Sequence, residues 1–198
     1  MKAGAGRIVY TSYMGASPSS HFVAMRDHAA TEELLQASGV PFTSLHNGFY
    51  ATTVRQFMGP ALQTGTIELP EDGPVSWTTH ADLAEAAAVV LTDEGRFDGL
   101  TPPLTAAKAV DFDRVAAIAS ALTGKTITRV TVSDDDYRAS MAGHGLPGSV
   151  TEMLLGIFAA SRAGEFAAVD PTLATLLGRT PTGLEAFLRD GTSSDTKA

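Results

Sequence analysis

The sequence predicts an α/β fold built on a parallel sheet and followed by a mostly helical second part. Residues 7–46 contain a strand, a helix and a second strand, which is the βαβ unit that joins parallel strands. After residue 100 the pattern changes to helices with one or two strands. We therefore expect a partial sheet domain over residues 1–100, a smaller lobe over 101–190 and a disordered tail over 191–198.

The βαβ unit is defined by its apolar runs and by the residues that end them. Arg7–Ser12 is mostly apolar, which predicts a strand buried on both faces. A helix is expected over 22–37, because Ser38 and Gly39 form a typical C-terminal cap. After Pro41, the run 42–46 predicts the second strand. The helical residues expected near one face are Ala24, His28, Thr31, Leu34 and Leu35.

The remaining elements are shorter. Extended pieces are expected at 66–69, 75–77 and 126–132. The stretch 143–148 fits G-x-G-x-x-G, but a polar helix precedes it, so it is predicted to connect two helices. Gly4-Ala-Gly6 has no strand before it and is predicted to be a helix-to-strand turn. Helices are expected at 49–58, 79–91, 111–122, 134–142, 148–163, 172–177 and 182–189.

The composition excludes several classes of function. The net charge is −8 and no basic patch is present, which argues against a nucleic-acid partner. The chain has no cysteine, so disulfides, thiolate catalysis and Cys-ligated metal sites are excluded, and no metal site is predicted. No apolar run reaches the roughly 18 residues of a membrane span, so we expect no membrane partner and a cytoplasmic location.

The best candidate site follows the second strand directly. Asn47 offers both a donor and an acceptor, and Gly48 allows close approach of the backbone. Phe49 and Tyr50 provide flat apolar faces for a ring, and Ser12 is expected to open onto the same crevice at the carboxyl ends of the strands. The residues equally allow a strand-to-helix turn whose aromatic side chains pack into the core.

The histidines are a second set of candidates. His28 and Glu32 are four residues apart on one predicted helix, which is typical of a surface pair. His21 stands seven residues before His28 and shares its face if the helix extends that far back. A histidine in this position is either structural or lines a pocket.

Several stretches together resemble a known family in order and spacing. In the second half they are 133–137, 145–147 and 177–184. In the first half they are 7–12, 28–35, 38–43, 47–50 and 79–88. The set resembles the NmrA-like, atypical short-chain dehydrogenase family, and most of all its NAD(P)H:quinone oxidoreductase type 2 branch.

The resemblance implies a Rossmann-type domain that binds NADPH or NADH, and a small lobe that closes a substrate cleft. It places Asn47, Gly48, Phe49 and Tyr50 along the nicotinamide side of the cofactor. Related reductases carry a functional lysine where this chain has His28, so His28 and Tyr50 become the candidate catalytic proton donors.

The chain departs from the family pattern in two ways, and three functions stay open. No lysine follows a tyrosine by four residues, so the dehydrogenase dyad is absent. The chain resembles the C-terminal part of the family's sheet, without the glycine loop, so weakened cofactor binding and an exposed strand edge that favours a homodimer are expected. The alternatives are a reductase of quinone-like or small carbonyl acceptors, a non-catalytic redox-sensing regulator of NmrA type, and an inactive truncated fragment.

Overall fold

The structure, a computed structural model, describes residues 6–93 and 95–195. Its strands are β1 (Ile8–Tyr13), β2 (Phe42–Asn47), β3 (Thr66–Pro70), β4 (Gly99–Leu100) and β5 (Thr128–Val132). Its helices are α1 (Val23–Ser38), α2 (Thr52–Met58), α3 (Ala61–Thr64), α4 (His80–Thr92), α5 (Phe112–Thr123), α6 (Asp134–Gly143), α7 (Gly148–Arg162), α8 (Thr172–Leu177) and α9 (Leu184–Asp195).

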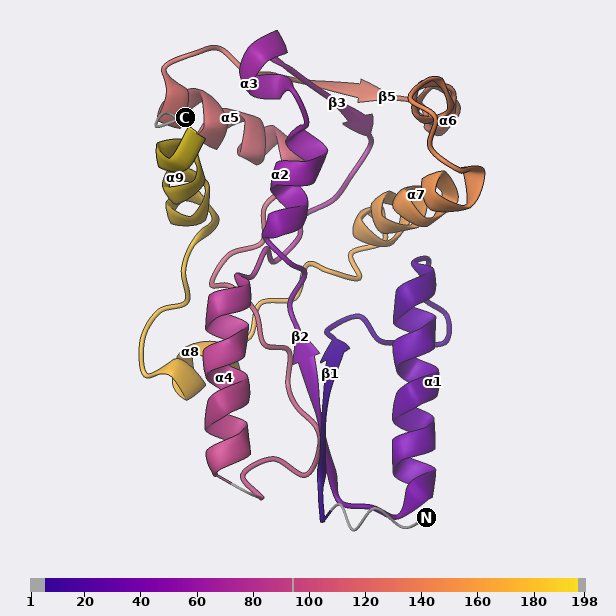
Figure 1. Cartoon of the computed structure of the whole chain (residues 1–198), viewed down its shortest axis with the longest axis vertical. Helices are drawn as coiled ribbons and strands as arrows, with labels where there is room; N and C mark the ends of the chain where they lie inside the picture. Colours follow the sequence, from indigo (N-terminus) through magenta and orange to yellow (C-terminus); the bar gives the residue numbers. More distant parts are fainter. Residues whose placement is uncertain (1–5, 94, 196–198) are drawn as a thin grey trace.

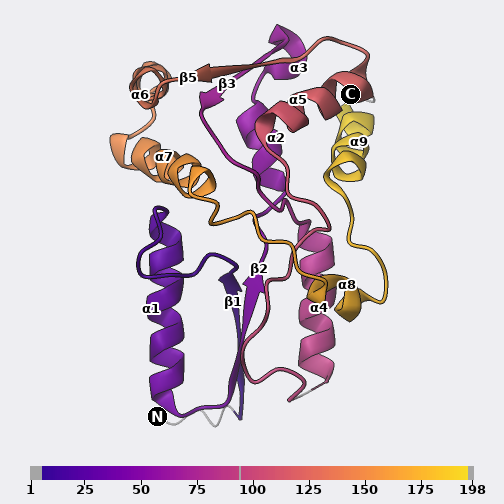
Figure 2. The ribbon, with the colours of Figure 1, turned by 180° about the vertical axis from the view of Figure 1, so that it is seen from behind.

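The main sheet is parallel, in the order β1-β2-β4, which confirms the predicted fold class. Its register runs from Ile8 opposite Phe42 to Tyr13 opposite Asn47. Helix α1 lies on one side of β1 and β2, and α4 lies on the other (Figures 1 and 2). Both strands therefore end at the same edge of the sheet, where their last side chains can meet.

Strand β1 is not buried on both faces, so that prediction is wrong. Of its six residues only Ser12 is buried. Within the described residues β1 pairs with β2 alone, so it is an edge strand with one row of backbone groups unpaired. An apolar run cannot distinguish an edge strand from a central one, because the neighbouring strand is not part of the local pattern.

A second, two-stranded sheet lies beyond the carboxyl ends of β1 and β2 (Figure 1). It pairs β3 with β5 in parallel, from Thr66 opposite Thr128 to Pro70 opposite Val132. A strand from the first hundred residues is thus completed by one from the second hundred. The division into domains at residue 100 stays a prediction.

Helix α1 confirms the expected element but buries a different stripe. Gly39 ends it in the left-handed conformation at φ 68°, as the sequence predicts. The buried residues are Met25, Ala29 and Glu32, whereas Leu34 is 72% exposed. Hydrophobic periodicity missed this face because a carboxylate belongs to it.

The other predicted helices are confirmed, with shifted ends. The helix expected at 49–58 begins only at Thr52, because Tyr50 first forms a β-bridge with Thr78. The loop 143–148 does connect two helices. Helix α9 continues to Asp195, into the predicted tail, while residues 196–198 and Gly4-Ala5 lie outside the described residues.

Two apolar clusters build the core. One packs the main sheet against α4 and α8. The other is rich in aromatic rings and includes Phe49, Trp77, Phe112, Phe158 and Phe166. Phe49 follows β2 directly, so the chain passes from the main sheet straight into the aromatic core of the second part. None of the described helices is long and apolar enough to cross a membrane.

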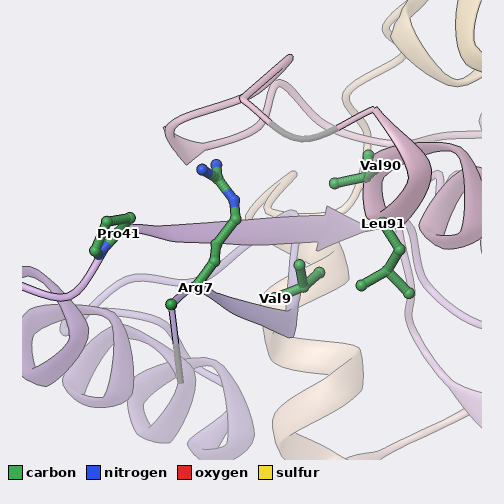
Figure 3. A pocket seen from close by; sticks show the side chains of 6 residues that line it. Arg7, Val9, Pro41, Val90 and Leu91 are labelled. Carbon is green, nitrogen blue, oxygen red and sulfur yellow. The ribbon is translucent and has the colours of Figure 1, made fainter. Parts of the chain in front are cut away.

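A pocket of about 490 Å³ lies at the amino ends of β1 and β2 (Figure 3). It is lined by Arg7, Val9, Pro41, Val90 and Leu91, together with one glycine. The Arg7 guanidinium is already engaged by Thr43 Oγ1 and by Asp98 at 2.5 Å. The pocket is at the opposite end of the sheet from the predicted site, and parallel α/β sheets bind their ligands at the carboxyl ends.

Candidate functional site

The candidate site is the edge at which β1 and β2 end. Tyr13 and Asn47 are register partners there, and the backbone N–H of Met14 donates to the Asn47 carbonyl at 3.0 Å. After β2 the chain leaves the sheet through Gly48, Phe49 and Tyr50 and enters the second part of the molecule. The ends of two parallel strands therefore lie side by side at the place where the sequence predicts the site.

Two buried polar atoms at this edge have no hydrogen-bond partner among the described residues: Ser12 Oγ and Asn47 Oδ1. Both residues are buried, with 0% and 4% of their surface exposed. An unpaired buried polar atom costs about 1–3 kcal/mol, so such atoms are uncommon in folded proteins. Each therefore marks a place where a ligand or a water can add a bond.

That Ser12 and Asn47 open onto one crevice stays a prediction. Ser12 shares its strand face with Tyr10, which contacts α1. Asn47 shares its face with Leu45, which belongs to the core beneath α4. The register partner of Ser12 is His46 and that of Asn47 is Tyr13. Side chains alternate along a strand, but at this strand end the Tyr13 ring also contacts His28 on α1.

Gly48 and Phe49 are used inside the protein. The N–H of Gly48 donates to the Leu104 carbonyl at 2.8 Å, and a Cβ on Gly48 would lie 2.9 Å from that oxygen and closer still to Thr78. Phe49 is 4% exposed, with its ring centroid 4.8 Å from Phe166 and 5.6 Å from Trp77. Their positions match the alternative of a packed strand-to-helix turn, which holds Asn47 and Tyr50 in place.

Tyr50 is half-buried and contacts two further rings. Its centroid lies 4.8 Å from that of Tyr13 and 4.2 Å from that of His80, the first residue of α4. Burial raises the pKa of Tyr13 far above its usual value, and the hydrogen bond and charge of Tyr50 add to the effect. Tyr13 therefore stays protonated at neutral pH and can act only as a neutral hydrogen-bonding group.

His28 is half-buried and lies on α1 against both tyrosines of β1. Its Nδ1 is 2.6 Å from Tyr10 Oη, and its ring centroid is 5.2 Å from that of Tyr13. Burial lowers the pKa of His28, and the charges of Glu32 and Asp27 oppose the shift only in part. The imidazole is thus neutral at neutral pH.

The expected surface pair of His28 and Glu32 does not form, so that interpretation is wrong. The Glu32 carboxylate points to the sheet, where it accepts from Ser44 Oγ at 2.6 Å and lies 2.9 Å from His46 Nε2. Buried polar groups on β2 give the carboxylate partners that water would otherwise supply. His21 precedes α1 and instead contacts Glu165, with 2.6 Å between Nδ1 and Oε1.

Five side chains form one continuous row of contacts, which we call the tyrosine–histidine row: Tyr10, His28, Tyr13, Tyr50 and His80. The sequence prediction named only two of the five, and the structure links those two through Tyr13. The other three had a recognisable signal: Tyr10 is on the predicted first strand, Tyr13 directly follows it, and His80 opens a predicted helix. In the part of the chain that is described, no three His, Asp or Glu side chains are grouped to hold a metal ion.

Open parallel α/β sheets, those that bind nucleotides among them, hold their ligands at the carboxyl ends of the strands. No protein-family model matches the chain. Quinone oxidoreductase 2 of Escherichia coli is 32% identical over 183 residues, which is 92% of this chain and 63% of that protein. The NmrA-like family domain-containing oxidoreductase flvB of Aspergillus flavus is 27% identical over 185 residues, 91% of this chain and 60% of that protein.

Solved structures agree with these relatives. A crystal structure of an Escherichia coli NADPH-dependent quinone oxidoreductase has 30% identity and a TM-score of 0.85, and covers 94% of this chain and 67% of that one. A second, complexed with NADPH, has a TM-score of 0.86 over 96% of this chain and 66% of that one, at the same 30% identity. The chain belongs to the NmrA-like, atypical short-chain dehydrogenase family and aligns with part of its Rossmann-type fold. It spans about 60% of the length of the curated relatives.

Proposed function

We propose that the chain is an NAD(P)H-dependent oxidoreductase that reduces a quinone-like or small carbonyl acceptor at the carboxyl edge of β1 and β2. The observation that carries the proposal is the buried, unpartnered Asn47 Oδ1 at that edge. Two of the similar proteins, a quinone oxidoreductase and a quinone oxidoreductase complexed with NADPH, support the same reaction.

The side chains at this edge fit the nicotinamide end of the cofactor. A carboxamide group has two N–H donors, and the unpartnered acceptor of Asn47 can take one of them. Tyr50, half-buried and three residues after Asn47, offers an aromatic edge to a flat ring. Gly48 and Phe49 hold these two residues in position, and Ser12 offers an unpartnered hydroxyl oxygen on the neighbouring strand. When bound, NADPH or NADH supplies the hydride.

The protein's own part in the chemistry is to supply a proton. A quinone that accepts a hydride also needs one proton to become a hydroquinone. His28 and Tyr50 are the proposed donors, because both are half-buried and both contact Tyr13. A neutral phenol can donate its proton directly, and a neutral imidazole can donate one when its other ring nitrogen receives a proton in the same step.

The test is NADPH consumption with a quinone acceptor by the purified chain, compared with Tyr50→Phe and His28→Gln. We expect both variants to bind NADPH as the wild type does and to lower kcat by at least about tenfold. Binding without turnover in the wild type would instead support the redox-sensing regulator. An absence of binding up to millimolar cofactor would contradict the proposal and support the inactive fragment.

We also propose that two copies of the chain associate through the outer edge of β1. Among the described residues this strand pairs only with β2, so its outer backbone groups are free to form a further ladder. Light scattering at several concentrations tests this: a mass that stays at that of one chain would contradict it.

A further inference from the structure

We propose that Tyr10 is a positioning residue: it donates to Nδ1 of His28, so that the ring carries its proton on Nε2 and presents that N–H to the acceptor. The use of the proton rests on the proposed function. The tautomer itself does not, because it depends only on contacts between β1 and α1.

The contact is short and joins two different elements. Tyr10 Oη lies 2.6 Å from His28 Nδ1, and the two ring centroids are 5.6 Å apart at an interplanar angle of 51°. A phenol O–H is a stronger acid than the N–H of a neutral imidazole, and the unprotonated ring nitrogen is a better base than a phenol oxygen. The favoured form therefore has Tyr10 as the donor and Nδ1 as the acceptor.

No other described group near the His28 ring replaces Tyr10 as the hydrogen-bond partner of Nδ1. The charged or titratable groups around it are Asp27 and Glu32 on α1, His46 on β2, and Tyr13. The Glu32 carboxylate is engaged by Ser44 and lies 2.9 Å from the His46 ring. Within the described residues the ring of His28 has its hydrogen bond from Tyr10 at Nδ1, and Nε2 is left for another partner.

The arrangement also solves a problem of proton supply. A neutral imidazole that simply loses its Nε2 proton becomes an unstable anion. When Nε2 releases its proton to the acceptor oxygen, the Tyr10 O–H bond can break and a new N–H bond can form at Nδ1. His28 then ends as the other neutral tautomer and Tyr10 as a phenolate, which regains a proton from water. One proton leaves the protein for each hydride that the acceptor takes up.

The test is nitrogen NMR of the histidine rings in the wild type, Tyr10→Phe and Tyr13→Phe, with His28→Gln to assign the signals. We expect a single His28 tautomer with the proton on Nε2 in the wild type. Tyr10→Phe removes only the hydroxyl, and we expect a tautomer mixture and a raised pKa of His28, because the lost bond favoured the neutral ring. Tyr13→Phe keeps the Tyr10 contact and should leave the tautomer unchanged.

A proton on Nδ1 in the wild type, or an unchanged tautomer in Tyr10→Phe, would overturn the inference. Turnover gives a second arm: Tyr10→Phe should lower kcat about tenfold while KM changes little. The pH at which kcat changes should shift together with the pKa of His28. A wild type without turnover but with the expected tautomers would reject the proposed function and leave the positioning role standing.

Discussion

Two regions near the carboxyl edge of the sheet bury polar side chains and satisfy them differently. Asp82, in the first turn of α4, is fully buried and accepts from Thr79 Oγ1 at 2.8 Å and from the Thr182 N–H at 2.8 Å. It also pairs with Arg179, 2.8 Å away. Asn47 is also buried, with 4% of its surface exposed, yet its Oδ1 has no partner among the described residues.

The difference separates a structural polar group from one available to a ligand. Asp82 ties α4 to the segment that precedes α9, and its bonds are complete within the chain. Asn47 retains an unused acceptor, which is useful only if something else binds there. Both residues are polar and buried, and only their hydrogen bonds distinguish the structural role of one from the availability of the other.

The largest expected effect on stability comes from a change at Gly48, because this residue connects Asn47 to the core. Gly48→Ala should lower the free energy of unfolding by about 3 kcal/mol, since its Cβ would overlap Thr78 and the Leu104 carbonyl. Gly143→Ala, with open space around it, should be nearly neutral. Urea unfolding measures both, and equal values for the two variants would contradict the packing role.

The Asp82 network should give the next largest effect. Asp82→Asn keeps the shape but removes the charge and one acceptor, which should cost about 2 kcal/mol in urea unfolding. Glu85→Gln is the matched control, because Glu85 also bonds Arg179 but is exposed, and it should change stability by less than about 0.5 kcal/mol. Equal losses would mean that burial of Asp82 adds nothing.

The Asp82 contribution should also depend on pH. Burial alone would raise its pKa, but the bonds from Thr79, Thr182 and Arg179 outweigh burial and lower it. A lowered pKa in the folded state gives stability that is present above the ordinary carboxyl range and is lost as the pH falls through the folded value. The gap between wild type and Asp82→Asn should therefore be constant near neutral pH and shrink in acid. A gap that grows in acid would have the wrong sign.

A pair of buried serines gives the smallest and sharpest contrast. Ser44 and Ser12 are both fully buried, but Ser44 donates to Glu32 at 2.6 Å whereas Ser12 Oγ has no described partner. Ser44→Ala should cost about 1 kcal/mol, and Ser12→Ala should be neutral or stabilising. Thermal unfolding of the two variants decides the matter, and a larger loss for Ser12→Ala would show that its hydroxyl is bonded.

The parts of the fold that the sequence predicts well are those with local causes. The helix end at Gly39 depends on residues within one turn and is observed as expected. The observed caps at Gly124 and Ser133 have the same local cause. The parallel pairing of β1 with β2 follows from the helix between them. The pairing of β3 with β5 was not predicted, because about sixty residues separate the partners and no local pattern records the contact.

The candidate site was predicted by its place and only in part by its residues. The end of β2 was identified because ligands of parallel sheets bind at that edge. Tyr13 and His80 were missed because their contacts with Tyr50 depend on how β1, β2 and α4 meet in space. Glu32 was assigned to the surface because a charged residue is usually exposed, and only the buried donors on β2 reverse that rule.

The most direct test of the central claim is NADPH binding to the wild type and to Asn47→Leu. Trp77, the single tryptophan of the chain, is buried with its ring 5.6 Å from that of Phe49, so its fluorescence can report binding at this edge. We expect saturable binding by the wild type, and a variant that unfolds at the same urea concentration but binds about tenfold more weakly, the effect of about 1.4 kcal/mol. Equal affinity of the two proteins, or no binding by either, would contradict the assignment of the site.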